Sequence, residues 1–307
     1  MKRFFILISL IFINVSINAQ QLLDDEKLKH SKTYINLQEA ISDADNVYKL
    51  ELVSYGLDTL TKEISKLKNL QVINLSCNML ENLPEEFGEL TNLQKIYLDR
   101  NQLTSLPKSF GNLKNLKLLS INYNKFETLP YEISKLTNLD TISARDNNLK
   151  SMPDFHNCKI IRYIDFSNNQ IESIPESICE CSKLNELIVN NNIINELPQN
   201  LQKLENLEKL YVDENNITML GTEIGGIKNL KLFSAYNNRI IMIPPEIGLS
   251  KNLEEITLKS NPISDLPQEI NKLKHLRYMD LSNTLIKKDN VNKIQNYVPW
   301  AIISFPF

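Results

Sequence analysis

The chain has 307 residues, of which 42% are hydrophobic and 23% charged, a composition typical of folded globular domains that excludes wholesale disorder. Lys and Arg (34) nearly balance Asp and Glu (37), so the net charge of −3 lacks the basic excess of a nucleic-acid-binding protein. Seven Gly and three His offer little for phosphate-binding loops or acid–base chemistry, whereas Asn accounts for 39 residues.

Residues 1–19 have the three-part pattern of a secretory signal peptide. A basic Met1-Lys2-Arg3 precedes an apolar run from Phe4 to Ile13, and a more polar stretch ends at Ala19. The apolar run is about half of the ~20 residues that a membrane-spanning helix needs. We therefore expect cleavage near Ala19, export to the periplasm, cell surface or medium, and no membrane insertion afterwards. An uncleaved anchor is the alternative.

Residues 20–46 are expected to form a polar, flexible leader followed by an N-terminal cap helix. Tyr34, Leu37, Ala40 and Ile41 have the spacing of one helical face. Such a helix would cover the first unit of the repeat that follows.

A unit of 23 residues repeats over residues 47–286. Apolar residues stand at its positions 1, 4, 6 and 11, and positions 4 and 6 alternate with positions 3, 5 and 7, which are expected to be exposed. This alternation predicts one short strand with a buried face. In most units an apolar residue, often Leu, is followed by Pro and then by apolar residues that suit a short helical or 3-10 turn. Ten complete units and one partial unit begin at Val47, Leu70, Leu93, Leu116, Leu139, Ile161, Leu184, Leu207, Leu230, Leu253 and Leu276, and the unit at Leu139 has 22 residues.

Position 9 is Asn in nine successive units. A chain that turns inward after its strand leaves backbone N–H and C=O groups without partners, and an Asn amide can both donate to and accept from such groups. We therefore interpret these residues as a structural ladder rather than a ligand site: Asn78, Asn101, Asn124, Asn147, Asn169, Asn192, Asn215, Asn238 and Asn261.

The pattern LxxLxLxxNxLxxLPxxIxxLxN, followed for example by the unit from Leu93 to Asn115, resembles that of leucine-rich repeat proteins. The Leu-Pro step and the 23-residue length are similar to the Ras-suppressor-like and plant disease-resistance-like class. The resemblance implies an α/β solenoid, a curved right-handed horseshoe with a parallel sheet on its concave face and short helical or 3-10 turns on its convex face. It also implies recognition of proteins.

Residues 287–307 leave the repeat pattern and are expected to form a C-terminal cap. A helix is predicted from Asp289 to Tyr297, Pro299 ends it, and a closing strand is predicted from Trp300 to Phe305. The last unit of a solenoid needs such a cover.

Three cysteines and a histidine lie close together in the repeat frame. Cys158 and Cys181 hold equivalent, inward-facing positions of neighbouring units, while His156 and Cys179 are expected to face outward. A Cys158–Cys181 disulfide fits an exported protein, with Cys179 as a competing partner. Buried free thiols and a zinc site are the alternatives, although we expect no metal. Cys77 is expected to be an exposed free thiol.

Candidate binding residues lie on or beside exposed strand positions of the concave face. Tyr and Arg are frequent at the energetic hot spots of interfaces, and they occur here in two groups, with Tyr163 apart from both. The first group is Tyr97, Asp99, Arg100, Tyr123 and Arg145, and the second is Lys209, Tyr211, Asp213, Tyr236 and Lys259.

The sequence thus predicts a non-catalytic module that binds a protein or peptide, with no cofactor and no nucleic acid, because no stripe of a single charge sign is present. Carbohydrate binding, as an adhesin or envelope-glycan binder, is one alternative, since Tyr, Asn and Asp also suit sugars. An intracellular signalling scaffold is another if the N-terminus is not a signal. The sequence does not determine the partner or the oligomeric state.

Overall fold

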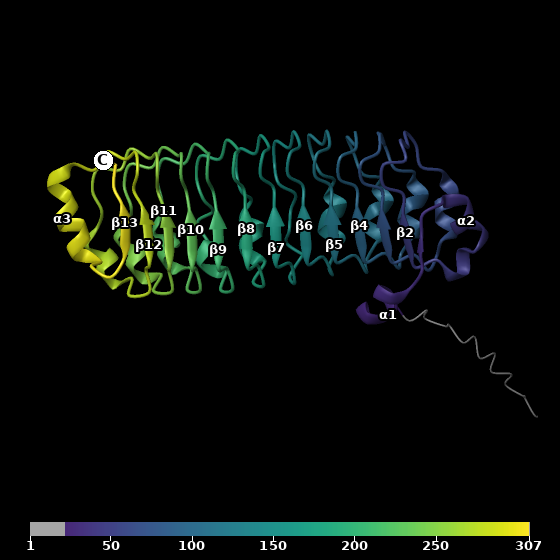
Figure 1. Ribbon diagram of the computed structural model, residues 1–307, viewed down its shortest axis with the longest axis horizontal. Helices are drawn as coiled ribbons and strands as arrows, with labels where there is room; N and C mark the ends of the chain where they lie inside the picture. Colours follow the sequence, from purple (N-terminus) through teal and green to yellow (C-terminus); the bar gives the residue numbers. More distant parts are fainter. Residues whose placement is uncertain (1–21, 307) are drawn as a thin grey trace, which may run out of the picture.

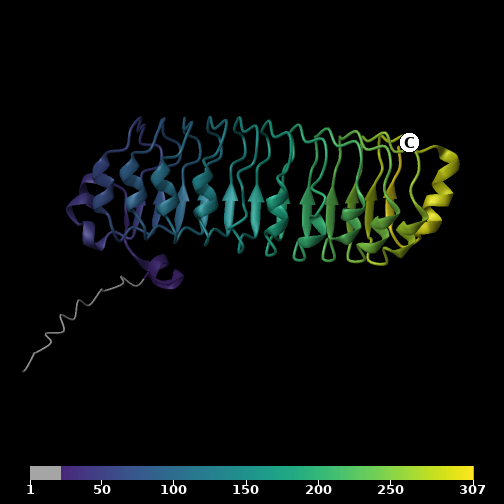
Figure 2. The same ribbon diagram turned by 180° about the vertical axis from the view of Figure 1, so that it is seen from behind.

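The computed structural model describes residues 22–306, in which 13 parallel strands stand side by side in chain order as one sheet (Figure 1). The sheet is open and curved and forms the concave face of a solenoid. Short helical turns lie behind it on the convex face (Figure 2). The predicted solenoid class is therefore confirmed, whereas the expected signal peptide at residues 1–19 lies outside the described residues.

Each repeat unit contributes one strand of three residues. The apolar residue at position 4 is the buried centre of the strand and lies opposite its equivalent in the next unit, as in Leu50–Ile73 and Ile73–Ile96. Positions 3 and 5 project from the concave face. The repeat strands are β2 (Lys49–Glu51), β3 (Val72–Asn74), β4 (Lys95–Tyr97), β5 (Leu118–Ser120), β6 (Thr141–Ser143), β7 (Tyr163–Asp165), β8 (Glu186–Ile188), β9 (Lys209–Tyr211), β10 (Leu232–Ser234), β11 (Glu255–Thr257) and β12 (Tyr278–Asp280).

Short 3-10 turns cover the convex side of most units. The Leu-Pro step supplies extended backbone at the start of the turn, as at Pro84, where φ is −67° and ψ is 152°. No such turn forms between β6 and β7, since the unit at Leu139 is one residue shorter, so the predicted turn is wrong for this unit. The turns are η2 (Lys62–Lys66), η3 (Glu85–Glu89), η4 (Lys108–Asn112), η5 (Tyr131–Lys135), η6 (Glu176–Glu180), η7 (Leu201–Lys203), η8 (Thr222–Gly226), η9 (Pro245–Leu249) and η10 (Gln268–Lys272).

One hydrophobic core runs the length of the solenoid between the sheet and the convex turns. Positions 1, 4, 6 and 11 are fully buried in the unit that begins at Leu93, and the same positions line the core in the other units. Aromatic side chains contribute to this core, and the rings of Phe87 and Phe110 stack with centroids 6.1 Å apart. Because each unit buries its apolar side against its neighbours, the stability of the solenoid depends on stacking.

Small residues let successive convex turns approach one another closely. A Cβ atom added at Gly225 would lie 1.8 Å from the backbone oxygen of Glu246, and one at Gly248 would lie 2.4 Å from that of Glu269. Cys179 occupies the equivalent position of its own unit and is buried there. Its expected outward orientation is therefore wrong, because the side chain at this position packs between two turns.

The Asn side chain at position 9 joins each unit to the one before it. In the case of Asn101, the amide oxygen accepts the backbone N–H of Leu80 at 3.1 Å, and the amide nitrogen donates to the carbonyls of Leu75 and Leu98 at 2.9 and 3.0 Å. The same contacts recur along the row. At its end, Thr284 replaces Asn and donates its hydroxyl to the carbonyl of Leu281 at 2.7 Å.

The residue before each of these Asn has a left-handed backbone. Its φ, like that of the equivalent Ser54 and Asn283 in the two units without this Asn, lies between 51° and 62°, although none of these eleven residues is Gly. Its N–H donates to a carbonyl of the next unit, as Arg100 does to Asn122 at 2.8 Å. Because this conformation costs energy for an L-residue, it depends on the Asn and on the neighbouring units to hold it.

The N-terminal cap begins with strand β1 (Thr33–Tyr34), which pairs with β2, followed by α2 (Leu37–Ser42) and η1 (Ala44–Asn46). Tyr34 therefore belongs to a strand and not to the predicted helix, because it extends the sheet over the first repeat. The expected flexible leader contains helix α1 (Asp25–His30), whose first turn is capped by the Asp24 side chain accepting from the N–H of Lys27 at 2.8 Å.

The C-terminal cap consists of α3 (Lys288–Tyr297) and β13 (Ile302–Ser304), which pairs in parallel with β12. Trp300 connects the two elements to the last complete unit. Its indole N–H donates to the carbonyl of Leu273 at 3.2 Å, and the Lys274 ammonium lies 4.1 Å from the ring centroid.

Replacing Asn147 with Ala is expected to destabilise the fold by at least about 2 kcal/mol, because it removes four hydrogen bonds and leaves buried backbone groups without partners. Urea denaturation followed by circular dichroism measures the loss. Asn148→Ala is the matched control, since that side chain is exposed. Equal denaturation midpoints for the two variants would contradict a structural role for the ladder.

Candidate functional site

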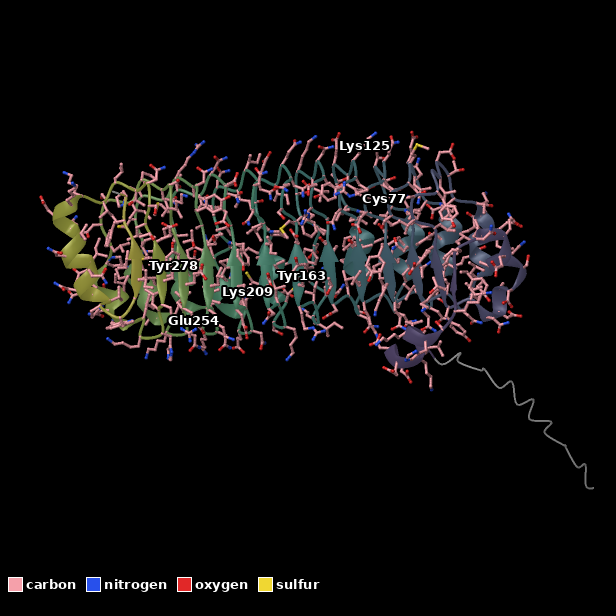
Figure 3. The ribbon with its side chains drawn as sticks, in the orientation of Figure 1. Cys77, Lys125, Tyr163, Lys209, Glu254 and Tyr278 are labelled. Carbon is pink, nitrogen blue, oxygen red and sulfur yellow. The ribbon has the colours of Figure 1, made fainter. Side chains whose placement is uncertain are left out.

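The concave face presents three rows of side chains, at positions 3, 5 and 7 of each unit. Register fixes which of them are neighbours. Tyr163, Glu186 and Lys209 follow one another along position 3 of β7, β8 and β9, and Ile188 lies beside Tyr211 at position 5. Figure 3 labels Tyr163, Lys209 and Tyr278 along this sheet.

The first predicted group is centred on an aromatic ring between two guanidinium groups. Arg100 lies 4.2 Å and Arg145 lies 5.4 Å from the ring centroid of Tyr123. Arg145 also donates to the Tyr123 hydroxyl at 2.7 Å and to Asp146 at 3.2 Å, and its pKa is raised, chiefly by the bond to Tyr123. These side chains lie at the edge where the strands end, whereas Tyr97 lies on β4 itself. The structure thus brings three of the five residues together.

The two predicted aspartates have internal roles. Asp99 accepts from the Ser120 hydroxyl and the Asn122 N–H at 2.6 and 2.8 Å. Asp213 accepts from the N–H of Tyr236 at 2.9 Å, and burial raises its pKa. With only 4% of its surface exposed, Asp213 is not available to a partner. Its expected place in the binding surface is therefore wrong, because the carboxylate satisfies groups of the next unit.

The remaining residues of the second group are accessible, and some are already paired. The Lys209 ammonium lies 3.3 Å from the Glu186 carboxylate, and that hydrogen bond raises the Lys209 pKa. Tyr236 donates its hydroxyl to Glu214, which raises the pKa of Tyr236 to about 12. Lys259 is exposed beside them.

Aromatic and aliphatic side chains gather at the middle of the sheet. Tyr163 and Tyr211 are half-buried, and burial raises the pKa of Tyr163 to about 12. Ile188, which the sequence analysis did not select, is half-buried between them at a position that is usually polar in the other units. We call Tyr163, Glu186, Ile188, Lys209 and Tyr211 the central patch.

The four cysteines are free thiols, so the predicted Cys158–Cys181 disulfide is not present in the structure. Both side chains are fully buried and face backbone carbonyls. The Cys158 sulfur lies 3.8 Å from the carbonyl oxygen of Ile133, and the Cys181 sulfur 3.8 Å from that of Phe155. Burial raises the pKa of Cys158 to about 11 and those of Cys179 and Cys181 to about 12. These features agree with the alternative of buried thiols.

The arrangement of His156 and the three neighbouring cysteines does not form the zinc site considered as an alternative. His156 lies 2.7 Å from Asp154 through Nδ1, and its ring stacks beside that of Tyr131 on the convex side. Across residues 22–306, no three His, Cys, Asp or Glu side chains are arranged to hold a metal ion. Within the same range, no helix is long and apolar enough to cross a membrane.

Comparisons with known proteins agree with this geometry. Two family models match the chain, one described as a leucine-rich repeat region at residues 47–144 and one as a leucine-rich repeat at residues 161–181. A comparison with curated proteins finds no match. The two family matches and the parallel solenoid sheet together show that the chain is a leucine-rich repeat protein.

Solved structures with the same fold include bacterial and plant proteins. A leucine-rich repeat protein of Leptospira interrogans is 26% identical over 90% of this chain and all of its own, with a TM-score of 0.50. The functional domain of InlJ from Listeria monocytogenes is 21% identical over 86% of this chain, with a TM-score of 0.72, and the match spans 54% of its length. The plant peptide hormone receptor RGFR1, solved in complex with RGF2, is 26% identical over 80% of this chain, with a TM-score of 0.63 and 45% of its own chain covered.

Alkylation of the reduced, folded protein at pH 8 is expected to modify Cys77 alone. Cys77 is exposed, whereas the other three thiols are buried, and a raised pKa lowers the fraction of reactive thiolate at this pH. Mass spectrometry counts the modified sites. The protein unfolded in denaturant without reduction should then expose four thiols. A count of two would instead support the predicted Cys158–Cys181 disulfide.

Proposed function

We propose that this leucine-rich repeat protein is an exported, non-catalytic module that binds a protein or peptide on its concave face. The central patch is the observation that carries the proposal, because it combines two half-buried tyrosines, one aliphatic side chain and an ion pair on an ordered surface. Tyr is frequent at energetic hot spots, and a partner that covers the half-buried side chains of this patch would complete their desolvation.

The sheet also favours binding through its rigidity. The central-patch side chains stand on β7, β8 and β9, and the hydrogen-bonded register of these strands fixes their spacing. A partner therefore meets a surface that needs little ordering on association, which reduces the entropic cost of binding. The plant receptor RGFR1, 26% identical to this chain, was solved in complex with RGF2, and this supports a peptide or protein as the ligand class.

Export is proposed from residues 1–19, whose basic start, apolar run and Ala19 have the order of a signal peptide. Mass spectrometry of the protein isolated from its own cells tests this. A mature N-terminus close to Gln20 is expected, and an intact Met1 in a cytosolic fraction would overturn export.

The binding proposal is tested by capture from envelope and culture-medium fractions. The baits are the unaltered protein, a concave variant with Ile188→Ser and Tyr211→Ser, and a convex control with Tyr131→Ser, whose side chain is 59% exposed on η5. A partner found with the first bait is then purified and titrated against all three. We expect the concave variant to bind at least about tenfold more weakly, as for a hot-spot truncation, and the control to bind as the unaltered protein does.

Equal affinity of the concave variant and the unaltered protein would contradict the proposed surface. Loss of binding by both variants would also contradict it, provided that circular dichroism shows all three baits equally folded. Competition by soluble glycans, with no protein retained, would favour the carbohydrate alternative.

A further inference from the structure

Helix α1 packs against the concave side of the first repeats. It lies at the edge where the strands begin, apart from the rest of the N-terminal cap (Figures 1 and 2). A hollow between α1 and the sheet is lined by Asp25, Leu28 and Lys29 on the helix side. On the sheet side it is lined by the position-3 residues of three successive strands, which are Lys49, Val72 and Lys95.

Three contacts hold the helix there. The Lys95 ammonium lies 3.4 Å from the Asp25 carboxylate, and the Lys49 ammonium donates to the carbonyl oxygen of Lys29 at 3.1 Å. Leu28 is the apolar contact, with 3% of its surface exposed. It does not belong to the continuous core of the solenoid. The core of the fold is therefore complete without α1.

The contacts between α1 and the sheet contribute little binding free energy. A helix of six residues is marginal on its own, and an ion pair with 36% and 76% of its two side chains exposed contributes little. Burial of one Leu side chain contributes roughly 2 kcal/mol. We expect α1 to detach and reattach without unfolding of the repeats.

The surface beneath and beyond α1 is basic. A second hollow continues from Asp25 along the starts of the next strands, where it is lined by Lys117, Ile160, Arg162 and Lys183 among others. Arg162 is paired with Asp140 at 2.5 Å. Lys117 and Lys183 have no ion pair within residues 22–306. The side chain of Ile160 is 44% exposed.

We propose that α1 is an internal ligand of this basic edge of the concave face. The surface it covers accepts an acidic amphipathic segment with a carboxylate three residues before an apolar side chain, as Asp25 stands before Leu28. Asp24, Asp25 and Glu26 supply the negative charge in the chain itself. A partner that carries such an acidic amphipathic segment can bind this surface only when α1 has detached. Helix α1 therefore competes with that partner.

Hydrogen exchange tests the detachment without any partner. Amides of residues 25–31 are expected to exchange at least tenfold faster in Leu28→Ser than in the unaltered protein, with no change in β2 to β12. Ile35→Ser is the matched control, because Ile35 is an aliphatic residue that is already 59% exposed. Equal exchange of α1 in the unaltered protein and in Leu28→Ser would overturn the proposal.

A labelled peptide of residues 22–32 tests the surface itself. We expect at least tenfold tighter binding to Leu28→Ser than to the unaltered protein, in which α1 competes. Addition of Lys95→Glu to the Leu28→Ser variant should weaken peptide binding by about twofold to fivefold, the range of an exposed ion pair, and added salt should weaken it as well. Equal binding to both proteins, or no binding to either, would overturn the proposal. Because the probe is the chain's own segment, this result is separate from the capture of an outside partner at the central patch.

Discussion

The structure depends on how each unit closes the turn after its strand. That turn passes through a residue with a left-handed backbone and leaves peptide groups buried, and the Asn that follows satisfies them with its amide. The amide bonds to carbonyls of two units at once, so a unit cannot hold the turn without its neighbour. Strand spacing, the continuous core and the concave surface all follow from this repeated link.

The same requirement shapes the surface that is available to partners. Two carboxylates predicted from the sequence to be available to a partner have internal hydrogen bonds, since Asp99 and Asp213 accept from groups of the following units. Side chains that have no such internal role remain on the surface, notably the aromatic and aliphatic members of the central patch. The proposed binding surface and the hydrogen bonds between units therefore use different side chains of the same strands.

The two ends of the solenoid need covering elements, because each terminal unit lacks one neighbour. Strands β1 and β13 extend the sheet, and α2 and α3 lie at its two ends beside the terminal repeats (Figure 1). Helix α1 stands outside this arrangement. It contributes no side chain to the continuous core and covers basic residues that the repeat pattern does not require. This makes it the segment of the described chain best placed to exchange with an outside ligand.

The sequence alone determined the repeat, its eleven starts, the buried positions and the Asn row, because a solenoid repeats the same local contacts and a period of 23 residues records them. It did not determine the orientation of Cys179, the internal role of Asp213, the strand at Tyr34 or the packing of α1. Those depend on which side chains of adjacent units or distant segments meet. Only the tertiary structure decides these contacts, because the burial and charge pairing of a side chain depend on its neighbours in space and not on its position in the repeat.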